Sequence, residues 1–310
     1  MGYRQNWRKH ETCVMSSQAV ARAARRDGEN AEEQVAMKHW RIEQMNWERF
    51  DPQRVDPDIV PLVKAASVVE RNGLDYARYL KNVFADDPAF RQAADNWAEE
   101  EVQHGDALGR WAMLADPAWD YMAAFERYRQ SYRLDLDVDA SIRGSRTGEL
   151  IARCMVETGT SSFYTALADA TDEPVLRAIC RQIAADEYRH FKLFYDHMNR
   201  YLRRERLGVW QRTRIALGRV TESEDDELAS AYHTTNEPAG LPYDHRRCIA
   251  AYMSRALRFY QPRHAVRVTG MILKTIGWTP HGRLHALIAR GLYRLLMMRQ
   301  RRFARVLATA

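Results

Sequence analysis

The spacing of apolar residues limits what this 310-residue chain can fold into more than any other feature. Four segments carry apolar or small residues at alternating intervals of three and four, which places those side chains along one face of a helix. The four segments cover residues 63–84, 90–111, 150–168 and 176–201. Helices bury such faces against one another, so the sequence predicts an all-α protein built around a four-helix bundle.

The connections between these segments predict the topology. A few residues join the first segment to the second and the third to the fourth, so each pair should be antiparallel. Residues 116–145 separate the second segment from the third, which is typical of the ferritin-like bundle with one long crossover. Tyr121, Phe125, Tyr128 and Tyr132 recur at helical spacing and predict a short helix in that crossover.

The chain should have three parts. We expect an N-terminal arm and lead-in over residues 1–54, the bundle over 55–205, and a basic C-terminal helical extension over 206–310. Pro88 and Pro174 lie where the second and fourth bundle helices should begin. Further helices are predicted in the extension near residues 210–231, 244–260, 263–278 and 282–307.

Cysteine usage and hydropathy exclude several protein classes. Cys13, Cys154, Cys180 and Cys248 are far apart and form no Cys-x-x-Cys pair, which argues against a zinc ribbon, a rubredoxin site or a disulfide framework. The N-terminus is charged over residues 4–9, and no apolar run approaches the ~20 residues of a membrane span. We therefore expect a cytoplasmic protein that is soluble or at most peripheral to the membrane.

Charge is distributed unevenly along the chain. Residues 245–310 contain 14 Lys plus Arg and no Asp or Glu. Subtracting these from the totals of 47 basic and 41 acidic residues leaves 33 basic and 41 acidic residues, so the rest of the chain carries a net charge near −8. The C-terminal part should therefore face something anionic.

The basic C-terminal part has two readings at this point. Apolar residues interleave with its arginines, so it can form an amphipathic surface for an acidic acyl carrier protein or an anionic membrane. The interleaved apolar residues are Leu292, Tyr293, Leu295, Leu296 and Phe303. Alternatively, it is a solvated basic face on helices that pack against the bundle. No recognition motif indicates nucleic acid.

Each of the four apolar stripes is interrupted in its middle by acidic or histidine residues. The interrupting residues are Glu70, Glu101, His104, Glu157, Glu187 and His190. Burying four glutamates costs several kcal/mol for each one unless positive charge compensates, and no Lys or Arg belongs to the stripes. Metal is the expected compensation, and two divalent ions would balance four carboxylates.

The spacing of these residues suits a dinuclear centre. In the pairs Glu101/His104 and Glu187/His190, an interval of three places both side chains on one face, roughly 5–6 Å apart at Cβ. One Glu from each of the other two helices completes the arrangement of di-iron bundles, and mixed carboxylate and imidazole ligation suits iron or manganese. A single Glu-x-x-His pair is usually a solvated surface pair, but here the only two pairs in the chain both lie on the buried seam.

Two stretches resemble a known family. Glu-Glu-Val-Gln-His-Gly-Asp at residues 100–106 and Ala-Asp-Glu-Tyr-Arg-His at 185–190 are similar to the two motifs of soluble acyl-acyl-carrier-protein desaturases, more than to bacterioferritins or rubrerythrins. Glu-Thr-Gly-Thr at 157–160 is similar to the third helix of that family. The likeness covers about residues 61–201.

This resemblance implies an enzyme with two carboxylate-bridged iron ions, O2 as co-substrate and a ferredoxin-like electron donor. Such a diiron oxidoreductase would desaturate or hydroxylate an acyl chain carried on a carrier protein or a lipid. By the same resemblance, Thr160 would assist oxygen activation and Asp186 would hold a ligand histidine. Tyr164 and Trp97 are expected to fill the core, and His197 to be a hydrogen-bonded core or rim residue.

A second functional class stays open. A ferritin-like or rubrerythrin-like protein that handles iron or peroxide would use a similar bundle. Those bundles usually lack large appended helical regions, and this chain has no rubredoxin cysteines to deliver electrons. The substrate, the bond attacked, the electron donor and the oligomeric state, for which a homodimer is one option, are not determined by the sequence.

Overall fold

The protein is helical throughout the part that its computed structural model describes, residues 40–221 and 226–309. These residues form α-helices and short 3-10 helices and contain no strand, which confirms the all-α class. The described residues fall into two units that divide after Gln44, and the second unit begins at Met45. Residues 1–39 of the predicted arm and lead-in (1–54) lie outside the described residues, and the three-part division at residues 54 and 205 stays a prediction.

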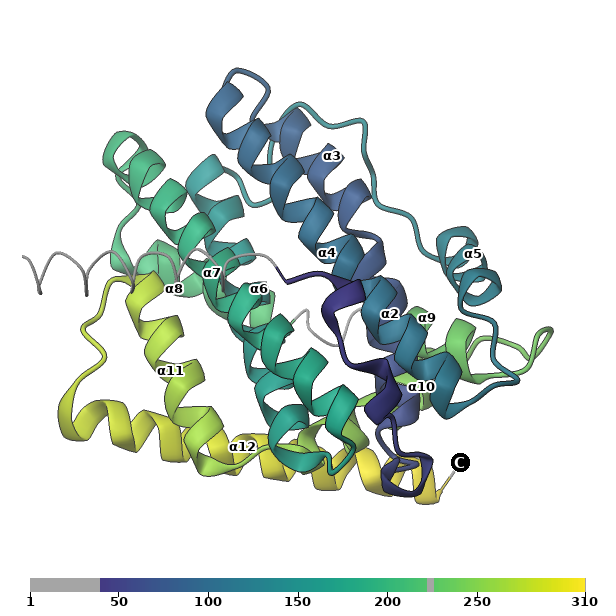
Figure 1. The fold of residues 1–310 in the computed structure, drawn as a ribbon. Helices are drawn as coiled ribbons and strands as arrows, with labels where there is room; N and C mark the ends of the chain where they lie inside the picture. Colours follow the sequence, from purple (N-terminus) through teal and green to yellow (C-terminus); the bar gives the residue numbers. More distant parts are fainter. Residues whose placement is uncertain (1–39, 222–225, 310) are drawn as a thin grey trace, which may run out of the picture. The chain divides into compact units, whose positions relative to one another are not determined.

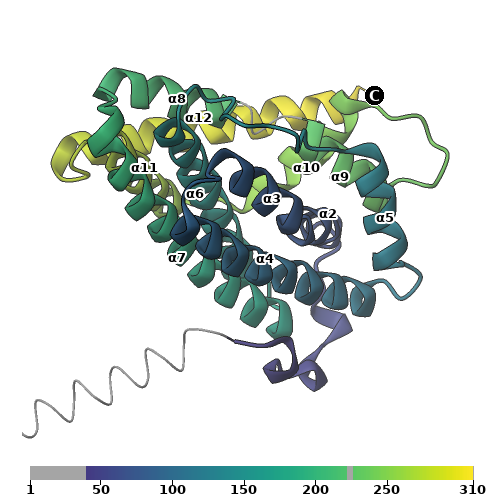
Figure 2. The same ribbon diagram turned by 90° about the horizontal axis from the view of Figure 1, so that it is seen from above.

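Two antiparallel helix layers form the bundle within the second unit (Figures 1 and 2). The first layer packs α2 and α3 against α4, and the second packs α6 against α7. Their bounds are α2 Val60–Arg71, α3 Gly73–Val83, α4 Pro88–Ala115, α6 Arg146–Ala170 and α7 Pro174–Glu205. The long crossover between α4 and α6 contains α5, Tyr121–Ser131, as its tyrosine spacing predicts.

Side-chain caps begin the bundle helices where the sequence places them. The Asp87 carboxylate accepts a hydrogen bond from the Phe90 amide at 3.1 Å, with Pro88 at the first position of α4. At the start of α6, Ser145 Oγ accepts from the Gly148 amide at 3.0 Å. These bonds pair amides that a helix start leaves without a partner, so the local sequence determines where α4 and α6 begin.

The first bundle segment is not one continuous helix as predicted. It divides at Asn72 into α2 and α3. A Cβ atom on Gly73 would lie 2.5 Å from Cβ of Glu101, so only glycine permits α3 to approach α4 this closely. The break therefore occurs directly beside one of the predicted metal ligands.

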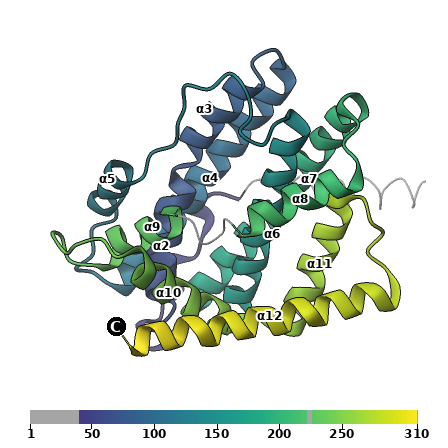
Figure 3. The same ribbon diagram turned by 180° about the vertical axis from the view of Figure 1, so that it is seen from behind.

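The C-terminal helices cover the bundle on the side of α2 and α6. Here α8 and α11 pack against α6, α9 and α10 pack against α2, and α12 packs against α10 and α11 (Figure 3). Their bounds are α8 Val209–Thr221, α9 Asp226–Asn236, α10 His245–Ala256, α11 Pro262–Ile276 and α12 Gly282–Ala308. The helix predicted over 210–231 is thus two helices, on either side of residues 222–225, which lie outside the described part. Among the described residues, no helix combines the length and apolar character needed to cross a membrane.

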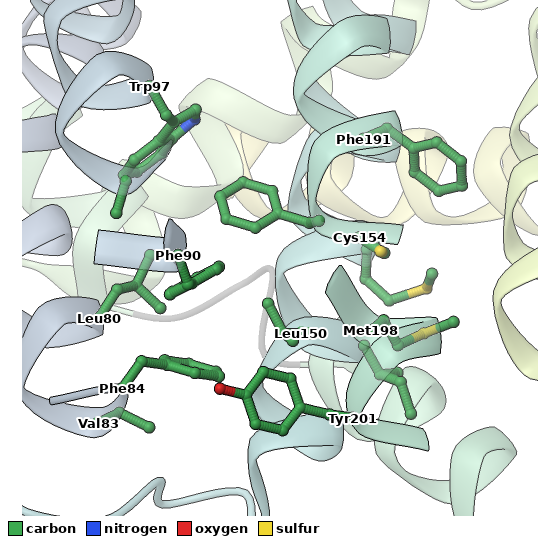
Figure 4. Packing of buried hydrophobic residues seen from close by; sticks show 14 of the residues in the cluster. Leu80, Val83, Phe84, Phe90, Trp97, Leu150, Cys154, Phe191, Met198 and Tyr201 are labelled. Carbon is green, nitrogen blue, oxygen red and sulfur yellow. The ribbon is translucent and has the colours of Figure 1, made fainter. Parts of the chain in front are cut away.

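An apolar cluster fills the bundle between α3, α4, α6 and α7 (Figure 4). Its labelled members are Leu80, Val83, Phe84, Phe90, Trp97, Leu150, Cys154, Phe191, Met198 and Tyr201. The Phe84 ring lies 4.1 Å from the Phe90 ring and 5.2 Å from the Tyr201 ring, centroid to centroid. Cys154 is buried and free, in keeping with its role as a small apolar side chain.

Glu173 joins the lead-in to both layers of the bundle. Its carboxylate is fully buried and caps α7 by accepting from the amides of Val175 and Leu176. It also accepts from the Trp111 indole at 2.7 Å and from the Asp51 amide at 3.2 Å. One buried carboxylate therefore satisfies donors from the lead-in, α4 and α7.

We predict that Glu173→Ala lowers the free energy of unfolding by roughly 3 kcal/mol, because it leaves several buried donors without an acceptor. Glu173→Gln is the matched control, since its amide oxygen still accepts hydrogen bonds, and it should lose less than half as much. Chemical denaturation of the three proteins measures both losses. Equal losses in the two variants would contradict the assignment of the effect to hydrogen bonding.

Candidate metal centre

Four helices bring the six predicted metal ligands together in the bundle core. Their side chains form two overlapping groups in which the potential ligand atoms all lie within 4.8 Å of one another. The first group is Glu70, Glu101, His104 and Glu187, and the second is Glu101, Glu157, Glu187 and His190. Glu101 and Glu187 belong to both groups, so two neighbouring ions at these positions would share them.

Each imidazole faces carboxylates through its Nδ1 atom. His104 Nδ1 lies 3.2 Å from Glu187 Oε1 and 3.8 Å from Glu70 Oε2. His190 Nδ1 lies 3.1 Å from Glu101 Oε1 and 3.9 Å from Glu157 Oε2. The two imidazole rings are 5.7 Å apart, centroid to centroid. The site therefore has two similar halves, one for each histidine.

A further carboxylate fixes the opposite side of each imidazole. Asp186 Oδ2 lies 2.9 Å from His104 Nε2, and Glu100 Oε2 lies 3.0 Å from His190 Nε2. A carboxylate at this distance holds the proton on Nε2, so the Nδ1 lone pair points toward the other carboxylates. The sequence analysis did not identify Glu100 as a site residue, although it directly precedes Glu101 in the same motif.

The donor atoms fit a pair of metal ions. His190 Nδ1 and Glu187 Oε1 are buried and have no hydrogen-bond partner in the described part of the chain. A nitrogen lone pair 3.1 Å from a carboxylate oxygen is repelled by it unless a cation or a proton lies between them. Carboxylates and imidazoles together are ligands that iron and manganese accept.

The crowded carboxylates shift one another's pKa values. Burial, and then repulsion from Glu187 and Glu70, raises the pKa of Glu101 well above its usual value. Burial raises the pKa of Glu157 to about 8, although Arg153 opposes the rise. Burial also disfavours the charged form of Glu187, but the two neighbouring histidines lower its pKa well below the usual value. Protons therefore supply part of the positive charge that two cations would bring.

No Lys or Arg lies on the four apolar stripes, but one basic side chain beside a stripe reaches the glutamates. Arg153 is buried, and its guanidinium donates to Glu157 Oε1 at 2.7 Å. The guanidinium also lies over the Trp97 ring, 4.6 Å from its centroid. Arg153 precedes Glu157 by four residues, so a helix places the two side chains on the same face.

Arg153 changes the balance of charge at the centre. Four glutamates and the two carboxylates that contact the histidines carry six negative charges, while Arg153 and Arg189 carry two positive charges. Arg189 forms an ion pair with Asp186 and lies 3.5 Å from Glu100. Four negative charges remain, and two divalent ions match them. The expected number of two ions is therefore unchanged, although more residues enter the charge balance than the sequence indicated.

Two hydroxyl groups also contact the glutamates. Thr160 Oγ1 donates to Glu187 Oε2, and Tyr164 Oη donates to Glu70 Oε1 at 2.5 Å. Tyr164 is therefore more than core filler, which was the expectation for it. His197 accepts from Arg200 at 2.8 Å, so it is a hydrogen-bonded histidine as expected. The Trp97 ring lies edge-on to a ligand histidine, with 6.4 Å between the centroids.

An apolar cavity of about 300 Å³ reaches the centre. Glu70, Thr160 and Tyr164 lie where the cavity meets the glutamate cluster. The rest of its wall is mainly apolar and comes from α2, α6 and the C-terminal helices α8–α12. Gly159 lines it too, and a Cβ atom added to Gly159 would meet no atom within 4 Å. A long apolar molecule could therefore lie against the centre.

We predict that the protein purified with iron holds about two Fe per chain, because the charge balance and the two ligand groups both require a pair. The double variant Glu101→Ala/His104→Ala should lose at least one ion, since it removes a shared carboxylate and an imidazole. Iron analysis on folded protein decides both points. A wild-type value near one, or two ions in the variant, would contradict the ligand assignment.

Comparison with known proteins agrees with this geometry. The family model described as "Fatty acid desaturase" matches residues 67–211, which include all six residues of the two groups. A search of curated proteins finds no match for the chain. Over this region the chain belongs to the fatty acid desaturase family, and within it to the acyl-acyl-carrier-protein desaturases, which are diiron oxidoreductases.

Proposed function

We propose that this protein is an O2-dependent diiron oxidase that desaturates, or hydroxylates, an acyl chain. The observation that carries the proposal is the apolar cavity that ends at two overlapping clusters of buried Glu and His. Two ions bound there would share Glu101 and Glu187, and each would have its own histidine and one further glutamate. With O2 and two electrons, a diiron centre supplies an oxidant able to remove hydrogen from an unactivated C–H bond.

The chain's own residues hold this centre in place. Asp186 and Glu100 fix the tautomer and orientation of the two imidazoles, which is how hydrogen-bonded carboxylates commonly act on ligand histidines. Tyr164 fixes Glu70 through a short hydrogen bond. Thr160 lines the cavity and donates to Glu187, so its hydroxyl is a donor at the boundary between the centre and the cavity.

The cavity also favours an acyl substrate over iron storage. Its volume of about 300 Å³ and apolar wall suit a flexible hydrocarbon chain. A ferritin-like or rubrerythrin-like protein handles Fe²⁺ or peroxide, which are small and polar, and needs no apolar cavity beside its centre. We therefore favour an acyl substrate over the iron- or peroxide-handling function.

The partners follow from the family and the charge distribution. A ferredoxin-like protein is the proposed electron donor, and the acyl chain arrives on a carrier protein or in a lipid. The basic residues 245–310 suit either an acidic acyl carrier protein or an anionic membrane surface. We place the protein in the cytoplasm, dissolved or at the membrane surface, with a homodimer as one possible assembly and no role for nucleic acid.

Mass spectrometry of acyl groups tests the reaction. The iron-loaded protein receives a ferredoxin-based reducing system, O2 and acyl groups presented either on carrier protein or in vesicles. Loss of two hydrogens identifies desaturation, and gain of one oxygen identifies hydroxylation. Consumption of O2 or peroxide without any change in the acyl groups would favour the iron- or peroxide-handling alternative.

We predict that Thr160→Val leaves the iron content unchanged but slows reoxidation of the reduced centre and raises the fraction of peroxide released. The change removes a hydroxyl donor beside the cavity at similar volume and removes no ligand. Thr165→Val is the matched control, because Thr165 lies on the same helix, outside the cavity lining, and donates to the Ser161 carbonyl at 2.7 Å. Indistinguishable kinetics in Thr160→Val and the control would remove Thr160 from the mechanism.

We predict that Gly159→Leu abolishes conversion of long acyl chains or shifts it to shorter ones, because the new side chain occupies the cavity beside the centre. Iron content and folding should be kept, since Leu favours a helix over Gly by up to about 1 kcal/mol. Gly159→Ala is the control, because it adds the helical preference with little volume. Unchanged chain-length preference in Gly159→Leu would show that the substrate lies elsewhere.

A further inference from the structure

The outward face of α12 carries large apolar side chains in contact with solvent. Of its 27 residues, only Ala289 and Phe303 are buried. Its most exposed apolar residues are Leu284, Leu287, Leu295 and Met298, with 48–64% of each exposed. At 100° per residue, these four lie within an arc of about 80°. Exposed apolar residues are usually scattered, so a row along one helix indicates a binding surface.

A row of arginines runs beside this apolar row. Arg283, Arg290, Arg294 and Arg301 are all exposed and lie within about 40° of one another on the same helix. No ion pair joins these four to a carboxylate within residues 40–221 and 226–309. The sequence from 245 to 310 contains no acidic residue that could neutralise them. The surface of α12 therefore combines apolar contact with uncompensated positive charge.

Helix α8 extends this surface. Its Trp210 is 85% exposed, and Arg214 and Leu217 follow at intervals of four and three on the same exposed side. The Arg212 guanidinium lies against Gly277, so α8 touches the turn that leads into α12. Figure 3 shows α8, α11 and α12 on the face of the second unit that is seen from behind. Tryptophan is enriched where proteins meet a membrane interface.

The inward side of the same helix forms part of the cavity wall. Leu292 and Leu296 of α12 line the cavity, together with Val220 of α8 and Ile272 of α11. Leu295 lies between the two lining leucines in sequence, yet it points away into solvent. One helix thus separates the cavity from the apolar and basic surface.

We propose that α12 and α8 dock the protein on an anionic membrane, with the apolar row in the interface and the arginines on the headgroups. A charged and amphipathic helix that lies in the interface plane has this composition. Docking itself does not depend on the reaction. The consequence that the acyl chain is drawn from a lipid of that membrane rests on the proposed function.

The surface suits a membrane better than an acidic carrier protein. The helix is about 40 Å long at 1.5 Å per residue, and its apolar row extends over more than half of that length. An acidic protein would be held chiefly by ion pairs at the arginines, so solvent-exposed leucines and Trp210 would add little. In the membrane interface, the same side chains leave water.

Vesicle sedimentation of the full-length protein tests the proposal. Vesicles of phosphatidylglycerol and phosphatidylcholine should sediment it at low salt, and vesicles of phosphatidylcholine alone should not. Replacing Arg283, Arg290, Arg294 and Arg301 with Gln should weaken binding by roughly a thousandfold. The matched control changes four exposed arginines elsewhere to Gln, with the same loss of charge, and should bind like the wild type. Those control positions are Arg78, Arg91, Arg129 and Arg181.

A second variant separates apolar insertion from charge alone. It changes Leu284, Leu287, Leu295 and Met298 to Gln, which keeps every charge and a good helix former at each position. This variant should lose sedimentation with the anionic vesicles. Sedimentation equal to the wild type would overturn the proposal and indicate a purely electrostatic partner such as an acidic protein. Absence of wild-type binding at low salt would overturn it as well.

Measurements without vesicles keep the two proposals distinct. Iron content and O2-dependent reoxidation of the reduced centre depend on the bundle, and both surface variants should retain them. Vesicle binding without conversion of any acyl group would leave docking intact and count against the proposed function. Conversion of carrier-bound acyl groups without vesicle binding would support the function and overturn the docking proposal.

Discussion

The burial of carboxylates at the centre is the constraint on which the bundle depends. Six carboxylates lie in or beside one core cluster, and burying charge without compensation costs several kcal/mol for each group. Arg153 and Arg189 offset two of the charges, and protons or two divalent ions offset the rest. Because the ligands come from all four bundle helices, metal binding and the packing of those helices are one equilibrium.

Small residues bring the ligands close enough to share ions. At Gly73 a Cβ atom would lie 2.5 Å from Glu101, and at Gly105 it would lie 2.6 Å from the Arg71 backbone nitrogen. Both positions lie where the first bundle segment meets α4, next to Glu70 and Glu101. A side chain at either glycine would push the two helices apart and separate those carboxylates. The backbone break at Asn72 and the position of Glu101 therefore both follow from the close packing of the first bundle segment against α4.

The sequence points to the six candidate ligands because periodicity and chemistry coincide there: a Glu or His in the middle of an apolar stripe faces the core, where the structure brings all six together. The sequence does not identify Glu100 and Tyr164, because each forms a hydrogen bond with a residue of a different helix. Spacing along one helix does not show how a neighbouring helix is rotated about its own axis. Arg153 differs from both. Its interval of four from Glu157 was readable, but it lies beside the stripe rather than on it.

One side of the centre is packed with apolar side chains, and another side opens into the cavity, which limits where a substrate can approach. The apolar cluster reaches the centre at Trp97, whose ring packs edge-on against His190, so that approach is filled by side chains. The cavity reaches it at Glu70 and Thr160, where space remains. An oxidant formed between the helices would therefore meet a substrate only from the cavity. Helices α8–α12 build the wall of that cavity away from the bundle, so in the proposed function the C-terminal helices would select the substrate and the bundle would supply the chemistry.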